Sequence, residues 1–278
     1  MLIHGMNGLG DCIYQRAFIR KYSGRVFLET PWPELYQDMR HVQVVRPATQ
    51  LRTQAKNIER CTRWRRPPPA QEQVVVRYGG AGIFNGMRSC FGFQPGQMDL
   101  PDFGPSPVSG HYVVVRPVTV RSEWVAESRN PDPLYVAQAA AEMRRRGYQV
   151  VSVADLEPGR EWAVEPLPPA DISFHRGELP VEKLLALLQH SAAVIGGIGW
   201  ILPAAIAARV PAWIVCGGQG GFNHPRLLTD RTTDLSLIEF AVPDEFCLCT
   251  ERDHPCNKRI SNHDQRFAAW ADQLPALV

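Results

Sequence analysis

Apolar residues along the chain follow two patterns that alternate from one end to the other. Short, nearly continuous apolar runs such as Tyr112 to Val115 are typical of strands that are buried on both faces of a parallel sheet. Between these runs, apolar residues recur at the spacing of one helix face, as they do from Val181 to Gln189. Such alternation predicts an α/β fold built on parallel sheets.

Strands are expected at residues 1–3, 25–29, 42–45, 74–78, 112–115, 148–153, 172–174, 193–195 and 211–215. Helices are expected directly after residue 11 and at residues 34–39, 50–66, 133–146, 181–189, 203–208 and 264–274. In the helix at 133–146, the residues expected to face the core are Leu134, Ala137, Ala141 and Met143. Residues 79–110 and 162–169 are expected to be loops.

The alternation of strand and helix runs through the chain twice, with a loop-rich stretch between the two rounds. We therefore expect two Rossmann-like domains facing a central cleft, residues 1–105 and residues 106–278, the second ending in a C-terminal helix. Open sheets of this class bind ligands at the carboxyl ends of their strands. The turns that follow the strands are therefore candidate functional sites.

The first of these turns holds three glycines, Gly5, Gly8 and Gly10, and ends in Asp11. Glycines allow the turn unusual backbone angles and let another molecule approach the backbone closely. A carboxylate at the start of a helix can cap that helix, and position alone favours this structural role for Asp11. The alternative role is that of a general base at the mouth of the expected cleft.

Two further glycine turns follow strands in the second half of the chain. Their glycines are Gly196, Gly197 and Gly199 in one turn, and Gly217, Gly218, Gly220 and Gly221 in the other. Such turns can present backbone N–H groups and a helix N-terminus to a phosphate. For the turn at 196–199, tight packing of strand against helix is an equally good explanation. That turn has neither the Gly-x-Gly-x-x-Gly fingerprint nor a Walker lysine, which disfavours dinucleotide redox chemistry and ATP hydrolysis.

The formal net charge of +2 hides an asymmetry between the two halves. Residues 1–105 carry 14 Lys and Arg against 8 Asp and Glu, whereas residues 106–278 carry 16 against 20. The excess of positive charge in the first half predicts an anionic partner there. Cations are mixed with an aromatic ring in one segment, at Arg60, Arg63, Trp64, Arg65 and Arg66.

The chain contains seven cysteines, and we find neither a signal peptide nor an apolar run that could span a membrane. This combination indicates a reducing cytoplasm and free thiols. A dense group of ligand-type residues, Cys247, Cys249, His254 and Cys256, could bind zinc or iron. Because its C-x-C spacing is tighter than the usual C-x-x-C, free thiols are the default expectation and a structural metal is the alternative.

The order of these features resembles that of the ADP-heptose:lipopolysaccharide heptosyltransferases. Gly8-Leu9-Gly10-Asp11 after a first strand is similar to their N-terminal signature. Residues 113–153 resemble the opening of their donor domain, and residues 178–217 resemble their leucine-rich helix, strand, glycine turn and alanine-rich helix. The chain departs from the family at Ile198 and Pro203, where the family usually has Asp and His.

The resemblance implies a GT-B glycosyltransferase that takes a nucleotide-sugar as co-substrate and needs no cofactor. Asp11 falls where the family places its catalytic base, with Gly8 and Gly10 beside the acceptor. Arg129 falls near a basic residue that contacts the donor phosphates, and Arg116 is a looser candidate for the same role. The implied reaction is a single displacement with inversion, in which arginines and helix N-termini stabilise the leaving nucleoside diphosphate without a metal.

Two anionic acceptors fit the basic first half. One is a phosphorylated, lipopolysaccharide-type glycan, which is the family default. The other is DNA carrying a hydroxymethylated base, as in virus-encoded DNA glycosyltransferases, because residues 60–66 offer cations for phosphates and a ring for an exposed base. An alternative of another class is a non-catalytic nucleotide-binding module that keeps the fold but not the reaction.

Overall fold

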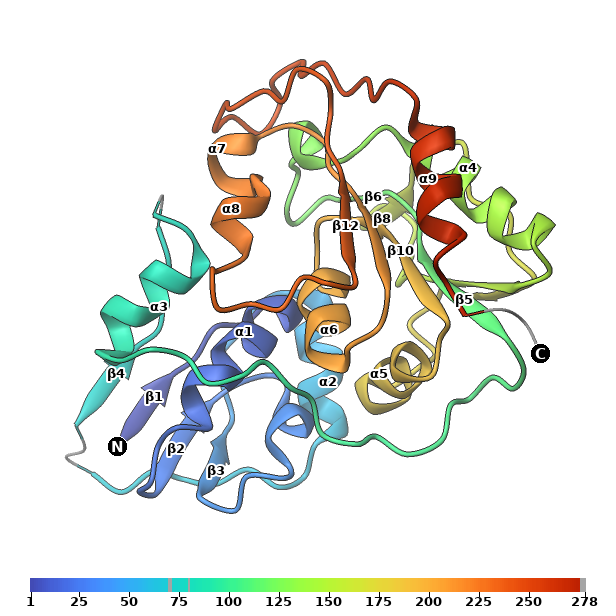
Figure 1. The fold of residues 1–278 in the computed structure, drawn as a ribbon. Coiled ribbons are helices and arrows are strands. Elements are labelled where there is room, and N and C mark those ends of the chain that lie inside the picture. Colours follow the sequence, from blue (N-terminus) through green and yellow to red (C-terminus); the bar gives the residue numbers. More distant parts are fainter. Residues whose placement is uncertain (70–71, 80, 276–278) are drawn as a thin grey trace. The chain divides into compact units, whose positions relative to one another are not determined.

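The computed structural model describes residues 1–69, 72–79 and 81–275, and the chain divides into two compact units (Figure 1). The first unit contains Met1–Asp102 and Arg226–Thr233, and the second contains Phe103–Pro225 and the chain from Asp234 onward. The expected domains also include residues 70–71, 80 and 276–278, which lie outside the described residues.

The first unit is built on a parallel sheet with the strand order β3-β2-β1-β4. Its strands are β1 (Leu2–His4), β2 (Val26–Glu29), β3 (Val42–Val45) and β4 (Gln73–Val75). Its helices are α1 (Leu9–Ile19), the 3-10 helix η1 (Pro33–Tyr36), α2 (Arg52–Arg60) and α3 (Ile83–Phe91). Every residue of α1 from Cys12 to Ile19 is buried, so the helix that follows the first glycine turn is part of the core.

The second unit is built on a six-stranded parallel sheet with the order β12-β11-β10-β5-β7-β9. Its strands are β5 (Tyr112–Arg116), β7 (Gln149–Val153), β9 (Ile172–Phe174), β10 (Ala193–Gly197), β11 (Ala212–Val215) and β12 (Ile238–Ala241). A separate antiparallel pair consists of β6 (Thr119–Arg121) and β8 (Glu161–Ala163).

Helices cover both faces of the six-stranded sheet (Figure 1). They are α4 (Pro133–Arg145), α5 (Val181–Gln189), α6 (Ile201–Ala208) and α9 (His263–Ala271). The chain also forms the 3-10 helix η2 (Glu127–Arg129), α7 (Gly220–Asn223) and α8 (Pro225–Leu228), and it returns to the first unit at α8. Val113 and Val115 share one core cluster with residues of α4 and α9, and Val114, which points to the opposite face, is equally buried. Strands covered on both sides explain the continuous apolar runs of the sequence.

The expected helix at residues 50–66 is wrong in its second half, because α2 ends at Arg60. Cys61 is already extended, and the N–H of Arg65 donates to the carbonyl oxygen of Val44 at 2.8 Å. The segment from residue 61 to residue 69 therefore runs as irregular chain beside β3. Its arginines do not lie on a helix face, since the edge of the sheet offers its backbone a hydrogen-bonding partner.

Three other expectations need correction. The loop expected at 79–110 contains α3, whose Phe84, Met87 and Phe91 are buried. The loop expected at 162–169 begins within β8. In α4, Leu134 and Ala141 are exposed, and the core is filled instead by Val136, Ala137, Ala139, Ala140 and Met143. This helix packs against both the sheet and α9, so its buried arc is broad and centred on small alanines.

Among the described residues, no helix is both long enough and apolar enough to cross a membrane.

Candidate active site

The first glycine turn lies at a reversal of strand order in the first unit. β1 lies between β2 and β4, and the turn leaves its carboxyl end, which is where open sheets bind ligands. Asp11 is half-buried in the first turn of α1, after the N-cap residue Gly8. A methyl group added at Gly8 would collide with the Asp11 carboxylate, so this carboxylate lies over the turn.

Buried groups hold this turn in place from two sides. The side-chain oxygen of Gln15 accepts the N–H of Met6 at 2.8 Å, and the thiol of Cys12 donates to the carbonyl oxygen of Met6 at 2.8 Å. From the other side, the indole N–H of Trp32 donates to the carbonyl oxygen of Asn7 at 2.8 Å. These hydrogen bonds fix the backbone of the turn at Met6 and Asn7, directly before the helix that carries Asp11.

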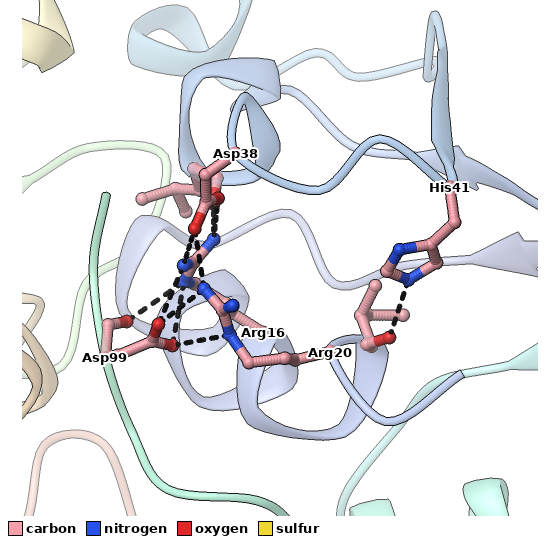
Figure 2. Close-up of polar contacts among 7 residues, drawn as sticks. Arg16, Arg20, Asp38, His41 and Asp99 are labelled. Atoms are coloured by element: carbon pink, nitrogen blue, oxygen red, sulfur yellow. Dashed lines mark hydrogen bonds and ion pairs between the residues drawn. The ribbon is translucent and has the colours of Figure 1, made fainter. Parts of the chain in front are cut away.

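Sequence reasoning missed a buried arginine on the same helix. Arg16 is fully buried, donates to both carboxylate oxygens of Asp38 at 2.7 Å, and reaches the Asp99 carboxylate at 3.0 and 3.1 Å. It also donates to the carbonyl oxygen of Leu35, and the more exposed Arg20 contacts the same two carboxylates (Figure 2). Two separate segments, residues 35–38 and the chain at Asp99, are thereby fastened to the helix that carries Asp11.

The five residues of the basic segment proposed for acceptor binding come after the edge strand β3 in the sequence, at the end of α2 and in the irregular chain that follows it. Arg60, Arg63, Arg65 and Arg66 are exposed, and Trp64 is half-buried. β2 separates β3 from β1, and the segment runs along the outer edge of β3, so about three strand spacings, roughly 15 Å, separate it from the strand that leads into the Asp11 turn.

In the second unit, the strand order reverses between β5 and β10. β7 and β9 extend the sheet on one side of β5, and β10, β11 and β12 extend it on the other. Arg116, the last residue of β5, is the sheet partner of Gly196 near the end of β10. The fold thus brings a candidate arginine and the first glycine of the 196–199 turn to the point where doubly wound sheets bind nucleotides.

Three arginines gather around this point with one buried carboxylate among them. Arg121 pairs with Glu161 at 2.7 Å, and Arg116 lies 3.8 Å from the same carboxylate. Arg129 donates to the carbonyl oxygen of Ile198 at 2.9 Å and so reaches the glycine turn. Burial, and next the proximity of Arg121, lower the pKa of Arg116 to about 10, which leaves it charged at neutral pH. Positive charges crowded together in this way favour an anionic ligand.

The two glycine turns of this unit differ in what surrounds them. In the turn at 196–199, an added methyl group at Gly196 would crowd the Ile201 side chain and the carbonyl oxygen of Arg116, whereas at Gly199 the nearest atom is a guanidinium nitrogen of Arg116 at 4.0 Å. Gly217, Gly218 and Gly220 are buried, and a methyl group at Gly217 would collide with the carbonyl oxygens of Arg129 and Asn130. Tight packing therefore explains the second turn.

The backbone amides of that second turn are also engaged. The N–H of Gly218 donates to the carbonyl oxygen of Ser128 at 2.7 Å, and the N–H of Gly220 donates to that of Cys247 at 2.8 Å. The sequence suggested that the amides of this turn bind a phosphate, but these two N–H groups already donate to backbone carbonyl oxygens. The turn at 196–199, which leads into α6, is the stronger candidate for phosphate contact.

The four ligand-type residues near the C-terminus come together in space. One ligand atom from each of Cys247, Cys249, His254 and Cys256 lies within 4.8 Å of all the others, and each residue is half-buried. The His254 Nδ1 atom is 3.4 Å from the Cys256 sulfur, and the sulfurs of Cys249 and Cys256 are 3.5 Å apart. Three thiols and one imidazole match the donor set of tetrahedral zinc or iron sites, so this geometry favours a metal over the default of free thiols.

Comparison with known proteins finds similar folds among solved structures. No protein-family model matches the chain, and no curated protein sequence does. A structure of the dodecameric iron-containing heptosyltransferase TibC in complex with ADP-D-beta-D-heptose matches with a TM-score of 0.58 and 17% identity, covering 98% of this chain and 76% of that one. In another TibC structure, from enterotoxigenic E. coli, the match covers 77% of this chain and spans 57% of the TibC chain.

Two further structures match along nearly their whole length. A family 9 glycosyl transferase from Veillonella parvula matches with a TM-score of 0.53 and 10% identity, covering 98% of this chain and 96% of that one. The ADP-heptose lps heptosyltransferase II of E. coli matches with a TM-score of 0.51 and 10% identity, covering 98% and 99%. The chain therefore has the mixed α/β fold of the GT-B heptosyltransferases, which confirms the α/β class with parallel sheets that the sequence predicts.

Proposed function

We propose that the protein is an inverting glycosyltransferase that binds a nucleoside diphosphate sugar on its second unit. The observation that carries this proposal is the pairing of Arg116 with Gly196 at the reversal of strand order, beside the turn that Arg129 contacts. A diphosphate placed there would meet two guanidinium groups and the N-terminal end of α6. The heptosyltransferase fold supports the same class of reaction.

In the proposed reaction, Asp11 takes the proton from an acceptor hydroxyl while that oxygen attacks the anomeric carbon of the donor sugar. The bond from that carbon to the diphosphate breaks, and the nucleoside diphosphate leaves with the bonding electron pair. Arg116 and Arg129 stabilise its new negative charge. The fixed backbone before α1 and the half-buried position of the Asp11 carboxylate support this role.

Nucleotide binding tests the donor site directly. Arg129→Ala is expected to weaken binding of ADP about tenfold or more, because a charge-assisted contact to phosphate is lost. Titration calorimetry with ADP, UDP and GDP measures the effect and identifies the base that binds best. Arg145→Ala, at a largely exposed arginine of the same unit, is the matched control and should bind ADP normally. Equal affinity in the two variants would remove Arg129 from the site.

We propose an anionic acceptor for the first unit, with a phosphorylated glycan as the first candidate. The exposed arginines after α2 supply the positive charge. DNA with a hydroxymethylated base is the second candidate, favoured by Trp64 among those arginines.

The triple change of Arg63, Arg65 and Arg66 to Ala separates the two acceptors. For a glycan acceptor, the variant should lose glycan transfer by about tenfold or more, while the wild-type protein binds DNA only weakly even at low salt. For DNA, the wild-type affinity should fall steeply with salt, and the variant should show a flatter salt dependence because fewer counterions are released. Binding of ADP by the second unit is the control and should not change.

We further propose that Cys247, Cys249, His254 and Cys256 hold a structural zinc or iron ion. The mutual distances of the four ligand atoms support this role. TibC, which shares the fold, is described as iron-containing. A metal bound by three thiolates and one imidazole has no open position for a substrate, so it would hold the surrounding chain in place rather than take part in the reaction.

A further inference from the structure

We infer that the metal-binding loop sets the position of Arg129, so that occupancy of the metal site governs affinity for the nucleotide. The cysteine loop is defined here as residues 245–258. The inference deepens the proposed function, on which it rests, by assigning the loop a role in donor binding.

The cysteine loop holds the short helix η2, which ends in Arg129. Ser128 is buried, its N–H donates to the carbonyl oxygen of Arg252 at 3.0 Å, and its hydroxyl donates to that of Glu251. The ammonium group of Lys258 donates to the carbonyl oxygen of Glu127 at 2.9 Å. The two residues that precede Arg129 are thus fixed by the loop through three hydrogen bonds.

The same loop also fixes the second glycine turn, which backs onto Arg129. The N–H groups of Gly220 and Gly221 donate to the carbonyl oxygens of Cys247 and Cys249 at 2.8 and 3.0 Å, so two of the metal ligands take part with their own backbones. A methyl group at Gly218 would collide with the sulfur of Cys256. The loop, η2 and the turn therefore pack as one body around the ligand atoms.

Besides its hydrogen bonds to η2 and to the glycine turn, the cysteine loop has its four ligand side chains to order it. Residues 242–262 are all described, and they form neither helix nor strand. Leu248, inside the loop, is one of the most exposed large apolar residues described, so burial of its side chain contributes little. In a loop of this kind, the binding energy of a metal is the energy that orders the chain. Loss of the metal would loosen Ser128, and with it the guanidinium of Arg129 that contacts the turn at 196–199.

Two variants test this coupling from opposite ends. Cys249→Ser removes a metal ligand, and Ser128→Ala removes the hydroxyl link but leaves all four ligands. Cys61→Ser, at a half-buried cysteine of the other unit, is the matched control. For each protein, metal content is measured by mass spectrometry, the fold by circular dichroism, and the dissociation constant for ADP by calorimetry. Each variant is also made in an Arg129→Ala background.

The wild-type protein is expected to hold about one zinc or iron ion per chain, the stoichiometry of a closed four-ligand site. Cys249→Ser should lose the metal and bind ADP about tenfold more weakly. Ser128→Ala should keep the metal and bind ADP about threefold more weakly, since one hydrogen bond is lost. In the Arg129→Ala background, neither change should weaken ADP binding further, because both act through Arg129. A loop that serves only stability would not produce this non-additivity.

Several results would overturn the inference. One is a folded, metal-free Cys249→Ser variant with wild-type affinity for ADP, and another is a wild-type protein that binds ADP but holds no metal. If Cys249→Ser does not fold, Ser128→Ala decides, and unchanged ADP affinity in that variant counts against the coupling. A wild-type protein that binds no nucleoside diphosphate at all would instead refute the proposed function.

Discussion

Replacement of Asp11 by asparagine is expected to reduce sugar transfer by about two orders of magnitude or more and to leave the fold intact. Asparagine keeps the size of the side chain and can still accept a hydrogen bond at the start of α1, but it cannot take a proton from an acceptor hydroxyl. The loss should therefore appear in kcat, with ADP affinity and melting temperature close to those of the wild type. Transfer of radiolabelled sugar from the donor measures it.

Two further variants keep this test specific. Asp102→Asn makes the same chemical change at an exposed position of the same unit and should retain full activity. Gly8→Ala keeps the Asp11 carboxylate but moves it, because the new methyl group would occupy the space that this carboxylate fills. We expect this variant to lose about tenfold or more in transfer, because a base must lie within hydrogen-bonding reach of the hydroxyl. Near-normal turnover by Asp11→Asn would end the assignment of Asp11 as the base.

The second large effect is expected on stability, at Arg16, whose proposed role is structural. Arg16→Met should lower the free energy of unfolding by about 3–5 kcal/mol, because it leaves two carboxylates and the carbonyl oxygen of Leu35 without their buried partner. Arg20→Met is the matched control, since Arg20 contacts the same carboxylates of Asp38 and Asp99 from a position that is 39% exposed. Its loss should cost under about 1 kcal/mol. Urea denaturation of both variants gives the comparison, and similar losses in the two would show that the burial of Arg16 does not matter.

The arginine cluster also predicts how stability changes with pH. Partial burial opposes ionisation of Asp38, but the hydrogen bonds from Arg16, and then from Arg20, outweigh it and lower the pKa of Asp38 from 3.8 to about 2. A carboxyl group whose pKa is lower in the folded state stabilises the fold above its unfolded pKa. This contribution is therefore present at pH 5 and is lost as the pH falls from about 4 to about 2. In Arg16→Met, the loss of stability over that range should be smaller.

Local sequence patterns were sufficient for much of the fold. The expected bounds of β3, β9 and α5 match those of the structure, because each is a clear apolar pattern bounded by residues that break it. A glycine turn between β1 and a helix was also predicted, with Asp11 near the helix start, although α1 begins at Leu9, so that Gly10 and Asp11 lie inside its first turn. Helix α3 was missed, although Gly92 directly after it has a positive φ of 76° and is a recognisable end signal.

The burial of Arg16 could not be predicted from its neighbours in the sequence. An arginine on an otherwise apolar helix normally reaches solvent, and its charge is tolerated here only because Asp38 and Asp99 pair with it. Those partners lie 22 and 83 residues away along the chain. The cysteine group was visible in the sequence, but its spacing could not show that all four ligand atoms converge.

By itself, the sequence determined the class of fold, the turn that carries Asp11 and the residue types of the candidate sites, because these depend on local periodicity and on glycine. Only the tertiary structure decided how closely the glycine turns are packed against the rest of the chain. It brought Arg116 beside Gly196 through the strand order, and it filled the space around Gly217 and Gly218 with the chain at 128–130 and the cysteine loop. The physical reason is that strand order and close packing are set by contacts between segments far apart in the chain, on which the local pattern carries no information.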